Sequence, residues 1–381
     1  MSSIRIVAHL AGVSPAAASL ALRGVGRLSA KTRAKVLKVA AELGYEPNPI
    51  LAKALSMTRQ APGERYRETI GFILEYATET GPAYQKAMHR AAAQRAESMG
   101  LKLESFVLTD TPAEHRRLKR VLKARGIRGV IIIPRLEHLQ PRLHLDWSEL
   151  AAVEIGRTLW NPRNLHHVET SDYNKVIEAI HLLKKAGYKR IGMAIEPMQN
   201  QHQRGTYYAA YLVSQLRQPE SQRIPVVAST GPWTEATFRT WFERYQPDVL
   251  FIHHAREICG WLKKMKVTWP GDISLFCVNA SEARDANMSG MVRDYPGLGR
   301  SAVEMLSLLL ESGEIGVPSR PRSWLVDEFW QAGTTLRLPI TRFVSEQGEL
   351  LPDALPRPDR SLAGFSVFRA EVGFGDGGHV R

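Results

Sequence analysis

Positively charged side chains are concentrated in the first sixty residues of the chain. This segment holds nine Lys and Arg against two Glu, a net charge of +7, while the other 321 residues carry +6 of the total of +13. Clustered cations such as Arg5, Arg23 and Lys31 can bind phosphates and release counterions, so that affinity falls with salt. A charge run alone is more often a solvated surface. The cations therefore suggest binding to the phosphates of a nucleic acid. This hypothesis requires a fold that presents them on one surface.

The run VAHLAGVSPAAASLAL, from Val7 to Leu22, predicts two short helices joined by a tight turn. Apolar residues at helical spacing precede a break at Gly12, and Ser14-Pro15 starts the second helix. The Ser14 hydroxyl can accept a hydrogen bond from an orphan N–H, and Pro15 suits the first helical position because its missing N–H is not needed there. This is the pattern of a helix-turn-helix, whose second helix would be the DNA-recognition element.

A third helix is predicted after Ser29, which can cap it. Its expected apolar positions recur at helical spacing and are Val36, Leu37, Ala40 and Leu43. Gly44 gives a C-cap signal. The prolines of YEPNP then separate this small domain from ILAKALSMTR, a helix-compatible segment too short to be stable alone. The sequence thus predicts a helical headpiece over residues 1–46 and a hinge helix over residues 47–59.

From Thr69 onward, short apolar runs alternate with amphipathic stretches, which predicts parallel sheets covered by helices. The strand-like runs are TIGFILEY, LKLESFVL, GVIIIP, LAAVEIG, HHVETS, RIGMAIE, IPVVAS, VLFIHH and SLFCVN, and the helical stretches are residues 83–99, 112–125, 172–186, 204–217, 233–245 and 255–265. This number of strands is larger than one doubly wound unit usually contains. We therefore expect two lobes, with ligands bound at the carboxyl ends of the strands. The predicted fold class is multi-domain α and α/β, with a headpiece followed by a two-lobed domain over residues 66–340.

About the first 55 residues resemble the headpiece of the LacI/GalR family of transcriptional regulators, on VAHLAGVSPAAASLALRG and SAKTRAKVLKVAAELGYEPNP. Residues 69–338 resemble the periplasmic-binding-protein-like domain of that family, on TIGFI, RGVIIIP, AGYKRIGMAI, QPDVLFIHH, WPGDISLFCVN and WLVDEFWQAGTTL. The resemblance implies a homodimeric transcriptional repressor that binds a double-stranded DNA operator, with a small sugar-like effector in the cleft between lobes. It also implies a first lobe of residues 69–163 that returns over residues 297–323.

The recognition helix departs from the family pattern, which places polar side chains after the turn serine. Here that helix begins Pro15-Ala16 and carries Ser19 and Leu20, so bidentate polar readout of bases is largely missing. Ala16 and Leu20 can meet thymine methyl groups instead. The residues expected on phosphates are Arg5, Ser14, Ser19, Arg23 and Lys31. We therefore expect the sequence specificity for the operator to depend mainly on DNA shape and on a kink at the operator centre.

The hinge departs from the family pattern as well. The leucine that the family wedges into the minor groove aligns with Ala54, and Leu55 follows one place later. Either the hinge helix starts one residue late or Leu55 takes this role, since Leu51 and Leu55 share a helical face. The alternative is that Leu55 packs the hinge helices together. Asn48, near the start of the predicted hinge helix, is also assigned to the DNA interface.

The family's effector positions carry over to Asp172, Arg204 and Asn279. The Asn-Asp that the family has after the VLFIHH strand reads His254-Ala255 here, so carboxylates that commonly grip sugar hydroxyls are missing and a standard hexose fits poorly. Two alternatives stay open. Arg204 can be an ordinary solvated or paired charge, and Asn279 can cap the following loop.

Other chemistry is not indicated by the sequence. The pairs His166-His167 and His253-His254 place neighbours on opposite strand faces, and phosphate-loop, H-E-x-x-H and paired-Cys motifs are absent, so we expect no enzyme, no metal and no cofactor. Two cysteines, the lack of a secretory leader and the lack of a long apolar run favour a cytoplasmic protein with no membrane span. Residues 341–381, rich in Pro and Gly, predict a flexible tail. A solute-binding protein of the transport type is the alternative function.

Overall fold

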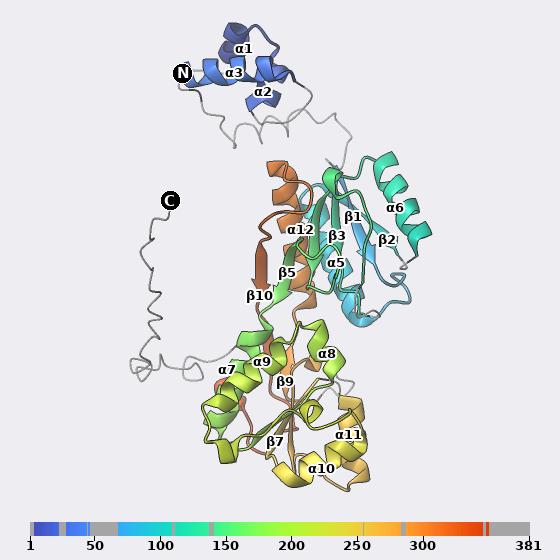
Figure 1. Ribbon diagram of the computed structural model, residues 1–381, viewed down its shortest axis with the longest axis vertical. Coiled ribbons are helices and arrows are strands. Elements are labelled where there is room, and N and C mark those ends of the chain that lie inside the picture. Colours follow the sequence, from blue (N-terminus) through green and yellow to red (C-terminus); the bar gives the residue numbers. More distant parts are fainter. Residues whose placement is uncertain are drawn as a thin grey trace, which may run out of the picture. The chain divides into compact units, whose positions relative to one another are not determined.

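The computed structural model describes residues 4–22, 28–43, 45, 68–108, 111–136, 141–253, 255–282, 287–345 and 348–349. The chain forms a helical headpiece and two α/β units (Figure 1). The first unit, to which the headpiece residues are also assigned, runs to Glu169 and takes back Tyr295–Trp324, while the second takes Thr170–Asp294 and the residues from Leu325 onward. No helix in the described part of the chain is long and apolar enough to cross a membrane.

The headpiece consists of three helices, α1 (Ile4–Ala11), α2 (Pro15–Leu22) and α3 (Ala30–Glu42). They share one small core, whose fully buried members are Val7, Ala8, Ala11, Ala18, Ala21, Val36 and Ala40. The prediction of Leu37 as a core position is wrong, because its side chain is 47% exposed. Val36 and Ala40 already fill the inward stripe of α3, and Leu37 is turned about 100° away from Val36 around the helix.

The first α/β unit contains a six-stranded sheet in the order β10-β5-β4-β3-β1-β2. The strands are β1 (Glu68–Leu74), β2 (Leu101–Val107), β3 (Gly129–Ile132), β4 (Ala151–Ile155), β5 (His166–Thr170) and β10 (Ser323–Val326). The helices are α5 (Ala83–Ser98), α6 (Pro112–Ala124) and α12 (Tyr295–Ser312), with the 3-10 helix η1 (Trp147–Glu149). Strands β1 to β5 pair in parallel.

The first unit extends further along the chain than the expected end at residue 163. Strand β5 pairs with β4, from Val153 opposite His166 to Ile155 opposite Val168, so it belongs to the first sheet. The first part of β10 closes this sheet on the other side of β5, where the His167 N–H donates to the carbonyl oxygen of Arg322 at 3.0 Å. The division between the units therefore falls after Glu169.

The second unit contains a five-stranded sheet in the order β11-β9-β8-β7-β6. The strands are β6 (Ile191–Ala194), β7 (Val249–Ile252), β8 (Ser274–Cys277), β9 (Gly290–Val292) and β11 (Phe329–Gln331), and only β11 runs antiparallel to its neighbour among these described strands. The helices are α7 (Asp172–Ala186), α8 (Pro197–His202), α9 (Thr206–Leu216), α10 (Glu235–Tyr245) and α11 (Ala255–Lys264). Four 3-10 helices complete the unit: η2 (Glu220–Gln222), η3 (Val227–Ser229), η4 (Ala280–Glu282) and η5 (Thr341–Phe343).

One predicted strand is wrong. IPVVAS ends in the 3-10 helix η3 instead of forming a strand. The hydroxyls of Ser229 and Thr230 donate to the carbonyl oxygens three residues earlier, at 2.8 and 2.7 Å. Such local bonds give the backbone an alternative to sheet pairing.

The predicted flexible tail begins too early. Ile340, Phe343 and Val344 lie in the core of the second unit, and the Trp330 N–H donates to the carbonyl oxygen of Gly348 at 2.6 Å. Packed structure therefore continues beyond residue 341. The residues from 350 onward lie outside the described part, as do Arg23, Asn48, Leu55 and the whole of the proposed hinge.

Candidate DNA-binding headpiece and candidate effector site

The turn between α1 and α2 has the geometry that the sequence predicts. Gly12 has a φ of +67°, a left-handed conformation that favours glycine, and its N–H donates to the carbonyl oxygen of His9 at 3.1 Å. The Ala17 N–H donates to the Ser14 hydroxyl oxygen at 3.1 Å, so the predicted N-cap is confirmed. Pro15 occupies the first position of α2.

Helix α2 buries alanines and turns its other side outward. Ala18 and Ala21 are fully buried against the headpiece core, whereas Ser14 and Pro15 are exposed and Leu20 is half-buried. Small buried side chains let α2 lie close to α1 and α3, so the stability of this element rests on tight packing of a small core. For Arg5, Ala16 and Ser19 the structure describes the backbone, which is helical.

Lys31 lies in the first turn of α3 and is exposed. The Thr32 N–H donates to the Ser29 hydroxyl oxygen at 3.0 Å, so Ser29 caps α3 as predicted. An exposed ammonium in this position can reach a phosphate, because its stem is anchored in a capped helix while its head stays in solvent.

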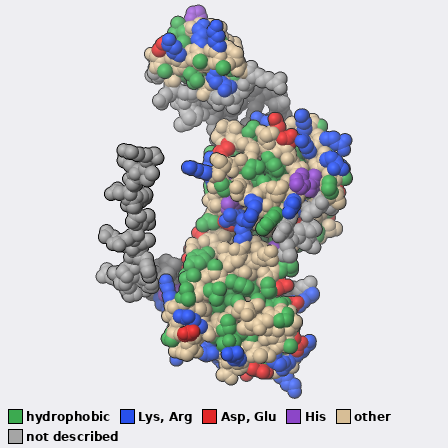
Figure 2. Space-filling model, in the orientation of Figure 1, with side chains coloured by type: hydrophobic (Ala, Val, Ile, Leu, Met, Phe, Trp, Pro, Cys, Tyr) green, Lys and Arg blue, Asp and Glu red, His purple; other side chains and the backbone are tan. Residues whose placement is uncertain are grey.

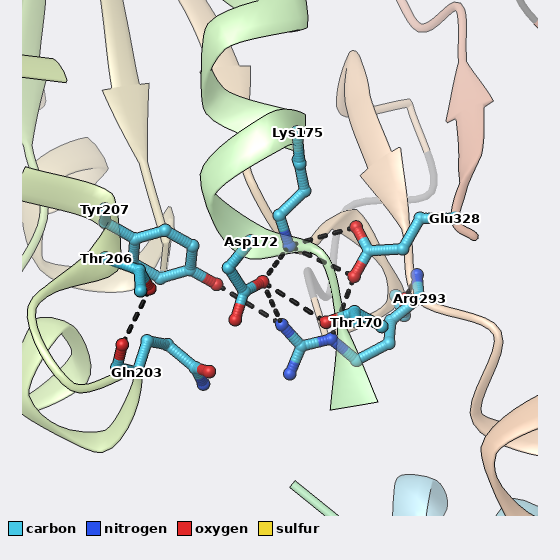
Figure 3. Close-up of polar contacts among 9 residues, drawn as sticks. Thr170, Asp172, Lys175, Gln203, Thr206, Tyr207, Arg293 and Glu328 are labelled. Atoms are coloured by element: carbon cyan, nitrogen blue, oxygen red, sulfur yellow. Dashed lines mark hydrogen bonds and ion pairs between the residues drawn. The ribbon is translucent and has the colours of Figure 1, made fainter. Parts of the chain in front are cut away.

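In the second unit, the predicted effector residue Asp172 lies in a buried ionic cluster, which we define as Asp172, Lys175, Arg293 and Glu328 (Figure 3). The Lys175 ammonium lies 2.6 Å from an Asp172 carboxylate oxygen and 3.0 Å from Glu328. The Arg293 guanidinium bridges the same two carboxylates, at 3.0 Å from each. Two cations therefore face two anions, and their formal charges cancel.

The chain builds this cluster from separate elements. Asp172 and Lys175 stand three residues apart in the first turn of α7, Arg293 directly follows β9, and Glu328 directly precedes β11. The Asp172 carboxylate also accepts from the Thr170 hydroxyl at 3.2 Å, and Arg293 donates to the Tyr207 hydroxyl oxygen at 3.3 Å. All four charged side chains are at most 13% exposed.

Two members of the cluster, Asp172 and Lys175, stay ionised despite burial. Burial alone would raise the pKa of Asp172, but Lys175 and Arg293 hold that pKa below its ordinary value. Burial alone would lower the pKa of Lys175, but Asp172 and Glu328 raise it above its ordinary value. Burial raises the pKa of the neighbouring Tyr207 phenol, which stays a neutral hydrogen-bonding group. A ligand that used Asp172 would therefore have to exchange with contacts that are already formed.

The other two predicted effector residues are placed differently. Asn279 is 1% exposed and lies two residues after β8, and Arg204 is exposed, with a φ of +53°, between α8 and α9. Asp172 contacts Thr170, Lys175 and Arg293 and, within the described chain, neither Arg204 nor Asn279. The structure thus does not bring the three residues into one set of direct contacts.

The headpiece and the domain behind it both match known families. Residues 3–48 match the model described as bacterial regulatory proteins, lacI family, and residues 180–325 match the model of a periplasmic binding protein-like domain. The chain thus joins a segment similar to the lacI family headpiece to a segment similar to periplasmic binding proteins.

Two curated proteins with similar sequences are transcriptional regulators. The HTH-type transcriptional regulator AglR of Rhizobium meliloti is 28% identical over 197 residues, which cover 51% of this chain and 52% of AglR. The HTH-type transcriptional regulator DegA of Bacillus subtilis is 27% identical over 154 residues, which cover 40% of this chain and 42% of DegA. The chain thus spans about half the length of the curated relatives that it matches. These relatives are transcriptional regulators and not enzymes.

Two solved regulator structures share the fold of this chain. The transcriptional regulator CelR in complex with cellobiose has a TM-score of 0.50 and 18% identity, and the match covers 88% of this chain and 100% of CelR. The Lac repressor bound to ONPG in the repressed state has the same TM-score and identity, with 88% of this chain and 99% of the repressor covered.

Sequence reasoning missed three members of the ionic cluster, namely Lys175, Arg293 and Glu328. Lys175 gave a usable signal: it falls on the same side of α7 as the buried Ala179 and Leu182, where a cation needs a buried anion. Arg293 and Glu328 follow or precede strands too short to be recognised, so their place beside Asp172 could not be foreseen. Among the described residues, no group of three or more His, Cys, Asp or Glu is placed to hold a metal ion.

Proposed function

We propose that this protein is a DNA-binding transcriptional regulator of the LacI family that binds a double-stranded operator in the cytoplasm as a homodimer. The observation that carries the proposal is the Ser14-capped helix α2 within the segment that matches the lacI family model. The net charge of +7 on residues 1–60 supplies attraction to phosphates. A two-fold dimer would present two copies of α2 to two half-sites, so the operator should be pseudo-palindromic.

In this proposal, contacts to DNA divide into positioning and reading. Arg5, Ser14, Ser19, Arg23 and Lys31 bind phosphates, whereas Pro15, Ala16 and Leu20 face base edges. Leu20 is the largest apolar side chain of this set, and it is half-buried. Asn48 and Leu55 act at the operator centre, where a wedge would favour easily kinked steps.

The proposed regulator acts as a repressor whose operator affinity responds to a small ligand. We assign Asp172, Arg204 and Asn279 to the effector site of the second unit. Because Asp172 is already neutralised by Lys175 and Arg293, the ligand would meet a charge-balanced group rather than a free carboxylate. CelR has been solved with cellobiose, which makes sugars and sugar acids the first ligands to test.

Operator binding is tested by selecting bound duplexes from a random library with the full chain, then measuring affinity by fluorescence anisotropy at two salt concentrations. We expect a pseudo-palindromic sequence to be enriched and its affinity to fall steeply with salt. Lys31→Ala should weaken binding to all sequences alike and reduce the salt slope by about one. Lys102→Ala, at an exposed position of β2, is the matched control and should change neither. Binding without sequence enrichment, or without salt dependence, would contradict the proposal.

Base readout is tested on the selected operator with Leu20→Ala. Loss of an apolar contact to a thymine methyl should cost about 1–3 kcal/mol of discrimination at one base pair and leave the salt slope unchanged. An unaltered base preference would show that Leu20 does not contact the bases.

The effector is tested by thermal shift with sugars and sugar acids, with Arg204→Ala as the control. If ligands stabilise that variant as well as the wild type, Arg204 has no role in the site.

A further inference from the structure

The first unit contains a cavity of about 630 Å³ between α6 and the segments 141–147 and 161–164. A cavity of this volume falls within the range of small-molecule sites. The residues assigned to the effector, Asp172, Arg204 and Asn279, all belong to the second unit, so this cavity is a different site. We call it the α6 pocket.

The α6 pocket exists because one connection of the sheet lacks a long helix. The chain between β2 and β3 forms α6, but the described part of the connection between β3 and β4 forms only η1, a single 3-10 turn. Leu143, Leu145 and Trp147 from this connection pack on the core under α6 and line the cavity. The pocket therefore has an apolar wall, which can take the body of a ligand.

Cations supply the charged wall. Arg116 and Lys119 stand three residues apart on α6, and Arg163 approaches from the segment before β5. Figure 2 shows Lys and Arg side chains gathered on the side of this unit where Figure 1 draws α6. The other polar residues of the lining are His144, Asn161 and Asn164.

Among the described residues, only one of these three cations is paired with a carboxylate. Lys119 pairs with Asp146 at 3.0 Å, and Asp146 also accepts from the Ser148 hydroxyl at 2.8 Å. Within the described chain, neither Arg116 nor Arg163 forms an ion pair with a carboxylate. The guanidinium carbon of Arg163 lies 4.2 Å from the centre of the Trp160 ring, a stacking contact that orients the guanidinium and leaves its N–H groups available.

We propose that the α6 pocket binds a small organic phosphate. The phosphate would be held by Arg116, Lys119 and Arg163, and the organic body would lie against Leu143, Leu145 and Trp147. A phosphate monoester carries close to two negative charges and three acceptor oxygens, which matches a partly neutralised ammonium beside two guanidinium groups that pair with no carboxylate in the described part of the chain. The guanidinium fork suits phosphate geometry because it donates two parallel hydrogen bonds.

The proposal is tested by isothermal titration calorimetry on the full chain with ribose 5-phosphate and AMP. Ribose and adenosine are their uncharged counterparts, and inorganic phosphate is the anion without a body. We expect the organic phosphates to bind more tightly than all three. The stronger of the two organic phosphates then shows whether the body is a sugar or a nucleoside. No binding by either, or equal binding by ribose and ribose 5-phosphate, would overturn the proposal.

Variants locate the site. Arg116→Ala and Arg163→Ala should each weaken binding of the better organic phosphate by about tenfold, because each removes a charge-assisted contact. Arg117→Ala is the matched control: Arg117 is exposed on the same helix and does not line the cavity, so affinity should change less than twofold. Equal weakening by Arg117→Ala would show non-specific attraction to a basic surface and overturn the proposal. Circular dichroism melting checks that each variant is folded.

Discussion

The two α/β units treat their charged side chains in opposite ways. In the second unit, Asp172, Lys175, Arg293 and Glu328 neutralise one another in the interior, and none is more than 13% exposed. In the first unit, Arg116 and Arg163 line an open pocket and pair with no carboxylate of the described chain. Asp172, which was predicted to bind the effector, is thus used in ion pairs within the protein. Arg116 and Arg163, which were not predicted to bind a ligand, face a pocket that a ligand can enter.

The contrast teaches that residue type and family position do not by themselves define a binding group. Availability depends on what surrounds the side chain, because a buried carboxylate that already has two cationic partners gains little from a third. The same reasoning predicts that charge changes in the two units have different consequences. They should disturb folding in the second unit and ligand binding in the first.

The largest effect is expected from Glu328→Gln. This substitution removes one of two anions that face Lys175 and Arg293, and leaves buried positive charge uncompensated. We expect a loss of about 3–5 kcal/mol in the free energy of unfolding of the second unit. Urea unfolding followed by tryptophan fluorescence and circular dichroism measures this loss, and the two signals together reveal whether the units unfold separately.

Glu304→Gln in the first unit is the matched control for Glu328→Gln. Glu304 pairs with Arg95 at 2.8 Å, but both side chains are more than a third exposed, so the loss should be below about 1 kcal/mol. Equal losses in the free energy of unfolding of the two variants would contradict the proposed difference between the units, since the buried cluster would then contribute no more than a surface ion pair.

An intermediate effect is expected from Gly299→Ala, which tests whether close helix packing stabilises the first unit. A Cβ atom at Gly299 of α12 would lie 2.3 Å from the carbonyl oxygen of Met88 on α5. The two helices would have to separate, at a cost of about 1–3 kcal/mol. Gly260→Ala in α11 is the control: nothing lies within 4 Å of its added Cβ, and alanine should stabilise that helix slightly. Similar unfolding midpoints for both variants would contradict the close approach.

The smallest effect is expected in the pH dependence of the second unit. Burial lowers the pKa of the His202 imidazole below its ordinary value of 6.5. The unfolded chain then takes up the proton first as pH falls, so stability should decrease below about pH 6.5. His202→Leu should make the decline between pH 7 and 5.5 shallower. The lowered pKa of Asp172 affects stability only at pH values near and below the pKa of an unfolded aspartate, so it does not contribute to the slope between pH 7 and 5.5. An unchanged slope would show that His202 does not titrate on folding in this range.

Most of the fold could be predicted because the periodic segments are long. The predicted helix at residues 172–186 matches α7, and the runs after Thr69 gave eight of the strands. The short strands β9 and β11, of three residues each, carry too little pattern to be recognised. Helix α12 was missed because Pro296, Gly297 and Gly299 at its start look like helix breakers, whereas tertiary contact with α5 requires the small residue.

The candidate sites were predictable to a lesser degree. The Ser14 cap could be predicted because its partner is three residues away, and local hydrogen bonds follow local spacing. The partners of Asp172 include Arg293 and Glu328, more than a hundred residues further along the chain. Such neighbours depend on how the sheet is assembled, which a single sequence does not encode in any short motif. The α6 pocket forms beside a connection whose described part, between β3 and β4, has no long helix, and no short motif marks such a place.

The packing of Phe343 and Val344 in the core of the second unit sets a practical limit on shortening the protein. A version ended at residue 340 would uncover the apolar surface beneath these two side chains and remove the hydrogen bond from Trp330 to Gly348. Such a truncated protein would be prone to aggregate during purification. Affinity tags, fluorescent fusions and protease sites inserted before Glu349 would therefore disturb this core.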